Sequence, residues 1–201
     1  MPGLRVQYPY CLLPEKLMLN FWKNLTLGRG AGLIALACIG MLGFGLYLQH
    51  GVGLEPCPMC IVQRYALILV AVCAILCWVS GLKASKNQAR STMPSVWAGV
   101  AVVFAAAGAF VAARQSFLQW YPPEVVSCGR DFYGMVETFP LKRAIPMIFK
   151  GGGDCSKVDW TFLGGSIANW SFLAFVGMGV VLVWLLLSAA GAKRTGALRS
   201  S

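Results

Sequence analysis

Residues 31–49 read AGLIALACIGMLGFGLYLQ, a run of 19 positions without a charged side chain. At a rise of about 1.5 Å per residue, a helix of this length measures about 28 Å, close to the ~30 Å thickness of a bilayer's hydrocarbon core. Such a segment must be helical in lipid, because its backbone polar groups find no other partners there. Three further apolar segments follow, at about residues 61–82, 95–113 and 166–192. The sequence therefore predicts an all-α membrane protein, a bundle of four transmembrane helices.

The composition agrees with a membrane protein and excludes several other classes. Of the 201 residues, 58% are apolar and 12% are charged, and the charged share is about half of the usual ~25%. So much apolar surface rules out a disordered chain and cannot be hidden inside a small globule. The single His and the seven Asp and Glu residues argue against a metal enzyme that uses histidine and carboxylate ligands.

The distribution of charge predicts the orientation in the membrane. Residues 1–29, 83–94 and 193–201 each carry a net charge of +3, whereas the connections 50–60 and 114–165 carry −1 and +1. Positively charged flanks remain in the cytoplasm. We therefore expect two cytoplasmic tails, 1–29 and 193–201, and two outer loops, 50–60 and 114–165. The net charge of +10 then reports topology, and no nucleic-acid partner is expected.

The predicted membrane domain, residues 30–192, includes the first apolar segment. An alternative is that this segment is a secretory signal, but no small-x-small cleavage site follows it. Met18 is a second candidate for the start of the chain.

Aromatic and small residues fit this arrangement. Aromatic side chains are enriched where a span meets the headgroups, and five fall near the predicted interfaces: Trp22, Trp120, Tyr121, Trp160 and Trp170. Glycines within the spans let helix backbones approach closely, and we expect this of Gly40, Gly43, Gly45, Gly99, Gly108, Gly177 and Gly179.

The topology sorts the eight cysteines by compartment. Cys11 falls on the cytoplasmic side, where its role is open. Cys38, Cys73 and Cys77 lie inside predicted helices, and we interpret them as small apolar packing residues. The other four fall in the outer loops, where disulfides persist if the compartment is oxidising.

The first outer loop ends in Glu-Pro-Cys-Pro-Met-Cys, which places Cys57 and Cys60 at the mouth of the second span. A Cys-x-x-Cys pair is shared by redox motifs and zinc sites. Zinc normally requires four ligands, and the sequence offers one His and no second Cys-x-x-Cys. A structural disulfide is a further alternative, but so short a loop restrains little chain entropy. Redox chemistry is the better interpretation, and no metal is expected.

Arg64 lies four residues after Cys60, one helical turn along the same face. A helix start and a nearby cation are the surroundings that lower the pKa of a thiol. The alternative is an arginine that merely anchors the span at the interface. A cation at the outer end of a span nevertheless opposes the topological bias, and an ionisable residue in the membrane is a functional candidate. A lipid-soluble electron acceptor with polar oxygens is the simplest partner.

The second outer loop contains Cys128 and Cys155, 27 positions apart. Chain entropy alone gives a bridge of that span a stabilisation of about 3–4 kcal/mol, so a structural disulfide is one interpretation. Three glycines, residues 151–153, come just before Cys155 and favour mobility instead. The apolar and basic segment 137–149 suits the membrane surface. Mobility near the membrane would serve thiol–disulfide exchange.

These motifs together resemble the disulfide bond formation protein B (DsbB) family of membrane quinone reductases, over about Trp22 to Ala192. The resemblance rests on PCPMCIVQRYAL at 56–67, LQWYPP at 118–123, GGDC at 152–155 and WTFLG at 160–164. It implies four spans with both termini in the cytoplasm, and residence in the bacterial inner membrane.

The resemblance also implies the roles of the four outer cysteines. Cys128, disulfide-bonded to Cys155, would be attacked by the reduced thiolate of a periplasmic thioredoxin-like partner, a DsbA-like oxidase. The electrons would then pass to the Cys57–Cys60 pair. This chain would thereby sustain protein disulfide formation as a protein dithiol:quinone oxidoreductase.

Two further residues are implied on the cofactor side. Cys60 would transfer the electrons to a membrane quinone, ubiquinone or menaquinone, held beside Arg64. Gln115 falls where some members of the family carry a His near the quinone, so it is a second candidate for cofactor binding.

Three other interpretations stay open at the level of sequence. A metal-handling membrane protein would use Cys57 and Cys60 as soft ligands. A non-enzymatic tetraspan protein with structural loop disulfides would not require Arg64 beside Cys60. An enzyme similar to vitamin K epoxide reductases would do related chemistry, but the Cys-x-x-Cys of that family lies late in the chain.

Overall fold

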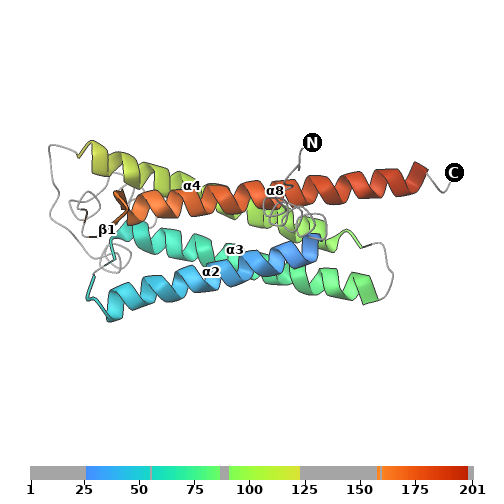
Figure 1. The fold of residues 1–201 in the computed structure, drawn as a ribbon, viewed down its shortest axis with the longest axis horizontal. Coiled ribbons are helices and arrows are strands. Elements are labelled where there is room, and N and C mark those ends of the chain that lie inside the picture. The colour runs from blue at the N-terminus through green and yellow to red at the C-terminus, as the bar shows by residue number, and fades with distance from the viewer. Residues whose placement is uncertain (1–25, 55, 87–90, 123–157, 159, 199–201) are drawn as a thin grey trace, which may run out of the picture.

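The computed structural model describes residues 26–54, 56–86, 91–122, 158 and 160–198 of the chain. It consists of four long helices that run side by side in an elongated bundle (Figure 1). Each is long and apolar enough to cross a membrane, which confirms the predicted fold class. The helices are α2 (Leu27–His50), α3 (Pro58–Lys86), α4 (Met93–Trp120) and α8 (Ile167–Leu198).

The observed helices extend beyond the predicted apolar runs. α4 continues to Trp120, although its last turns carry polar residues that the sequence analysis had assigned to the outer loop. Gln115 tolerates this position because it faces the bundle interior, at 3% exposure. Arg114 instead lies over the ring of Phe117, 5.6 Å from its centroid, within the last two turns of the helix.

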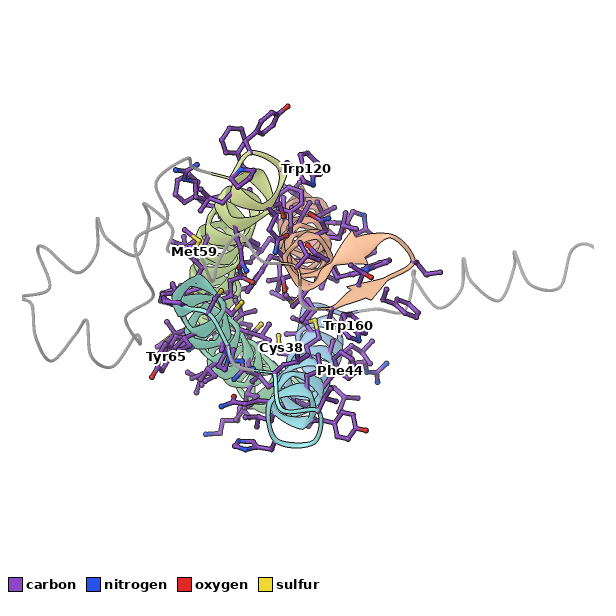
Figure 2. The ribbon with its side chains drawn as sticks, turned by 90° about the vertical axis from the view of Figure 1, so that its left-hand side faces the viewer. Cys38, Phe44, Met59, Tyr65, Trp120 and Trp160 are labelled. Carbon is purple, nitrogen blue, oxygen red and sulfur yellow. The ribbon has the colours of Figure 1, made fainter. Side chains whose placement is uncertain are left out.

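The four helices close around a narrow core of small side chains. α2 packs on α3, α3 on α4, and α4 on α8, while α2 and α8 contact each other far less. Buried alanines line the inner faces, and Cys38, Cys73 and Cys77 lie among them as expected of packing residues. Cys38 points into the bundle and Tyr65 points away from it (Figure 2). The weak α2–α8 seam is therefore where the bundle is most open.

Glycines permit close helix contacts at some predicted positions and not at others. A Cβ on Gly108 would collide with the ring of Phe175, so α4 and α8 meet closely there. α2 and α3 also cross closely, at Gly28 and Gly81, where a Cβ added to Gly81 would lie 3.2 Å from the Gly28 Cα. The expectation was wrong for four of the glycines, which have nothing within 4 Å of an added Cβ: Gly40, Gly43, Gly99 and Gly177.

A short hairpin precedes α8 at the end of the bundle where α3 begins (Figure 1). β1 (Thr161–Phe162) pairs antiparallel with β2 (Gly165–Ser166). Leu163 and Gly164 form the turn with φ values of 50° and 79°, as in a tight type I′ hairpin. The hairpin brings Trp160 against Phe44 of α2, with ring centroids 6.0 Å apart. This contact links the α8 side of the bundle to α2 across the open seam.

Candidate active site

Cys57 and Cys60 form the beginning of α3. Ile61 donates its N–H to the Cys57 carbonyl at 3.1 Å, which makes Cys57 the N-cap and Pro58 the first helical residue. Proline suits that position because its missing N–H has no helical partner there. The Cys57 sulfur accepts the backbone N–H of Cys60 at 3.3 Å, and the two sulfurs lie 2.8 Å apart. The motif thus places both sulfurs at the N-terminal end of the α3 dipole.

The side chain of Gln115 reaches these sulfurs from α4. Its Nε2 donates to Cys60 Sγ at 3.2 Å and to Cys57 Sγ at 3.3 Å. Its Oε1 accepts from Nε2 of Gln63, on α3, at 2.7 Å. Both glutamines are buried, at 3% and 6% exposure. The cysteine pair therefore lies at one end of a chain of side-chain amides that connects α3 with α4.

Arg64 lies on the other side of Cys60 and turns toward α2. Its guanidinium donates to Gln49 Oε1 and to the Gly45 carbonyl, the latter at 3.0 Å. The absence of a side chain at Gly45 leaves room for this contact, since a Cβ there would lie 3.7 Å from the guanidinium. The cation is thus held at the edge of the bundle interior.

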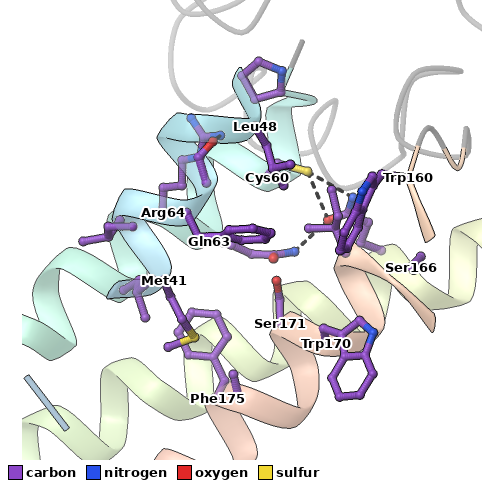
Figure 3. A pocket seen from close by; sticks show the side chains of 18 of the residues that line it. Met41, Leu48, Cys60, Gln63, Arg64, Trp160, Ser166, Trp170, Ser171 and Phe175 are labelled. Atoms are coloured by element: carbon purple, nitrogen blue, oxygen red, sulfur yellow. Dashed lines mark hydrogen bonds between the residues drawn. The ribbon is translucent and has the colours of Figure 1, made fainter. Parts of the chain in front are cut away.

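A cavity of about 500 Å³ opens beside these residues, between the outer halves of α2, α3 and α8. Cys60, Gln63 and Arg64 lie on one side of it, and Trp160, Trp170 and Ser171 lie on the other (Figure 3). Much of the remaining wall is apolar and is formed by Met41, Leu42, Leu48, Ala174, Phe175 and Met178. Its size and its few convergent polar groups are typical of a small-molecule site.

The electrostatics of the site favour negative charge on sulfur. The N-terminal end of the α3 dipole, with the Cys60 N–H donated to the Cys57 sulfur, the Gln115 amide and the Arg64 guanidinium all direct positive potential toward the cysteine pair. A thiolate is the reactive form in thiol–disulfide exchange. Within the described ranges, no cluster of three or more His, Cys, Asp or Glu side chains suited to a metal is formed.

The structure brings together four of the six predicted site residues: Cys57, Cys60, Arg64 and Gln115. Cys128 and Cys155 lie outside the described residues, as do Cys11 and most of the predicted loop 114–165. Gln63 and Gln49 are site residues that the sequence motifs did not indicate. For Gln63 a signal existed, because it lies three residues after Cys60 and thus on the same helical face.

Four membrane-spanning helices with a Cys-x-x-Cys pair beside a cavity define a membrane-bound dithiol oxidoreductase. The family described as "Disulfide bond formation protein DsbB" matches residues 29–185. The chain belongs to this family of disulfide-forming oxidoreductases, which confirms the resemblance and sets aside the non-enzymatic alternative.

Several curated relatives support the assignment, and each is named Disulfide bond formation protein B. The chain is 65% identical to the one from Polaromonas naphthalenivorans (strain CJ2) over 158 residues, which are 79% of this chain and 90% of the relative. It is 67% identical to that of Polaromonas sp. (strain JS666 / ATCC BAA-500), over 76% of this chain and 86% of the relative. Identity to that of Paracidovorax citrulli (strain AAC00-1) is 58%, over 89% and 98% of the two chains.

Proposed function

We propose that this protein is a thiol:quinone oxidoreductase of the bacterial inner membrane. It reoxidises a periplasmic thioredoxin-like disulfide donor of the DsbA type and passes the electrons to the membrane quinone pool. The observation that carries the proposal is that the Cys60 sulfur, within 3.2 Å of an amide donor, lines a cavity that also contains the Arg64 guanidinium. A sulfur that only stabilised the fold would not need a cation and a cavity beside it.

The electrons balance over three exchanges. The partner's dithiol reduces the Cys128–Cys155 disulfide, and the partner leaves with its own disulfide restored. The Cys128 and Cys155 thiols then reduce the Cys57–Cys60 disulfide. Finally, the Cys57 and Cys60 thiols return to the disulfide, and the two electrons and two protons that they release would be accepted by a quinone held in the cavity. Each step needs a thiolate, and the donors around Cys60 favour that form.

The residues around the cavity fit a quinone. When bound, a quinone supplies an acceptor for two electrons and two protons and is thereby reduced to the hydroquinone. Arg64 is positioned to donate to one ring oxygen, and the apolar walls formed by Met41, Leu48 and Phe175 suit a methylated ring. Because α2 and α8 contact each other weakly, their seam offers a path for an isoprenoid tail between the cavity and the lipid.

The charge distribution supports the proposed compartment. Arg29, Lys83 and Lys86 lie at the end of the bundle opposite to the cysteine pair, at the start of α2 and the end of α3. By the positive-inside rule that end is cytoplasmic, so the pair opens to the periplasm. An oxidising periplasm is where such a disulfide generator and its soluble partner would work.

The test is an assay of the purified full chain in detergent with a reduced thioredoxin-like partner and short-chain ubiquinone and menaquinone analogues. We expect the wild type to consume one of these quinones and Cys60→Ser to consume none. Cys73→Ser is the matched control, because Cys73 is buried on the same helix away from the cavity, and it should retain activity. Quinone consumption by Cys60→Ser at the wild-type rate would refute the proposal.

A further inference from the structure

We propose that Gln63 is a positioning residue of the redox site: its Nε2 donates to Gln115 Oε1 and so holds the Gln115 amide with its nitrogen toward both cysteine sulfurs. The contribution of Gln63 to turnover rests on the proposed function. The orientation of the Gln115 amide, in contrast, can be tested on the protein without quinone or partner.

A positioning residue is needed because the two ends of the Gln115 amide have opposite hydrogen-bonding roles. A glutamine presents a donor at one end and an acceptor at the other, and only the donor stabilises an anionic sulfur. If Gln115 were turned over, its oxygen would face the sulfurs and its nitrogen would face the Gln63 nitrogen. With Gln63 in its observed orientation, the 2.7 Å hydrogen bond from its nitrogen opposes that arrangement, because two donors would then meet.

Because the two glutamines are buried, a wrongly oriented amide would be energetically costly. Gln63 and Gln115 are both almost fully buried, so water offers little replacement for a misdirected hydrogen bond, and an unsatisfied buried polar group is costly. The amide oxygen of Gln63 points into the cavity on the side of Ser171 (Figure 3), which leaves its nitrogen for Gln115. The two glutamines therefore act as one unit.

The same geometry changes the role expected of Gln115. Its nitrogen donates to both sulfurs, at 3.2 and 3.3 Å, whereas its oxygen accepts from Gln63 at 2.7 Å and lies farther from the Cys60 sulfur, at 3.7 Å. The donor end of the Gln115 side chain is thus used on the two sulfurs. It acts on a quinone in the cavity through Cys60 rather than as a separate ligand of the ring.

The experiment measures thiolate reactivity in the absence of quinone and partner. The full chain is reduced in detergent, freed of reductant and treated with iodoacetamide over a range of pH, and modification of each cysteine is followed by peptide mass spectrometry. Only the thiolate reacts appreciably. Buried Cys38 serves as the internal reference for loss of folding.

At a fixed pH near neutrality we expect Gln115→Leu to slow Cys60 alkylation about tenfold, since a donor to a charged group is lost. Gln63→Leu should slow it three- to tenfold and shift the alkylation profile to higher pH. Gln63→Glu keeps the size of the side chain but replaces the donor by an acceptor, and it should slow the reaction at least as much. In the double variant Gln63→Leu/Gln115→Leu the effects should not add.

Ser116→Ala is the matched control. Ser116 is the neighbour of Gln115 on α4, and its buried Oγ has no hydrogen-bond partner among the described residues. Its replacement should leave the Cys60 profile unchanged. Arg64, the charged side chain on the same face as Cys60, is retained in every variant.

Two results would overturn the inference. One is Cys60 alkylation within twofold of wild type in both Gln63 variants, and the other is an equal loss in Ser116→Ala, which would make the effect one of packing. A wild-type protein that shows the expected alkylation pattern but reduces no quinone would refute the proposed function and leave this inference standing.

Discussion

Replacing Arg64 should separate the proposed quinone binding from thiol chemistry. Its guanidinium already donates to Gln49 and to the Gly45 carbonyl, and the rest of its five N–H donors remain for the cavity that it lines. A hydrogen bond to a charged group contributes about 1.5–3 kcal/mol. Because Arg64 is half-buried rather than fully enclosed, we take the lower end of that range, which corresponds to about a tenfold effect.

We therefore expect Arg64→Met to raise the KM for a short-chain quinone about tenfold, with a smaller fall in kcat. Gln49→Leu should raise the KM about threefold, because it removes one acceptor that holds the guanidinium in place. Arg114→Met is the control, since Arg114 lies over Phe117 and outside the cavity lining. The assay is steady-state quinone reduction with saturating reduced partner. A KM for Arg64→Met within twofold of wild type would make Arg64 an interfacial anchor and refute its role in binding.

Three other predictions follow from the proposed pathway, the packing and the topology. Cys128→Ser should abolish capture of the partner as a mixed disulfide, seen on a non-reducing gel, and capture that persists would move the entry point to another cysteine. Gly108→Ala should lower the thermal unfolding midpoint in detergent by an amount equivalent to about 1–2 kcal/mol, because its Cβ meets an aromatic ring of α8. Gly177→Ala, with nothing within 4 Å, should raise the midpoint slightly, and equal behaviour of the two would contradict the packing described. In spheroplasts, an impermeant maleimide should label Val52→Cys above the level of the parent protein. It should label Thr92→Cys only after permeabilisation. The reverse pattern would show that the topology is inverted.

The four spans and part of the site could be predicted from the sequence, because both depend on short-range patterns. A charge-free run of 19 residues has few alternatives to a membrane helix. The spacing of Cys57, Cys60 and Arg64 fixes their common face once α3 exists. The glycines illustrate the limit of such reasoning, because their number in a span does not say which of them faces a neighbour.

The features that could not be predicted from the sequence depend on how different helices pack against one another. Gln63 and Gln115 are 52 positions apart, and nothing local in either segment predicts that their amides meet. The last turns of α4 were expected to be loop because they contain Arg114 and Gln115. They are helical because the polar groups of these residues find partners, one in an aromatic ring and one in the cysteine pair.

The position of the cysteine pair suits the two media that the proposed chemistry requires. A soluble dithiol can be met only at the aqueous end of the bundle, whereas a lipid-soluble oxidant arrives from the hydrocarbon. The first turn of α3 lies at one end of the bundle and beside the cavity, where the proposed partner and oxidant would both reach it. The N-terminal end of the helix dipole also stabilises an anion there. Deeper in the bundle, Cys38 lies among apolar side chains and contacts Met178 at 3.4 Å. No described hydrogen-bond network of amides surrounds that sulfur, so a thiolate there would be destabilised. Whether a cysteine of this protein is reactive or inert is therefore set by its position along the bundle, at the end beside the amides or deeper among apolar side chains.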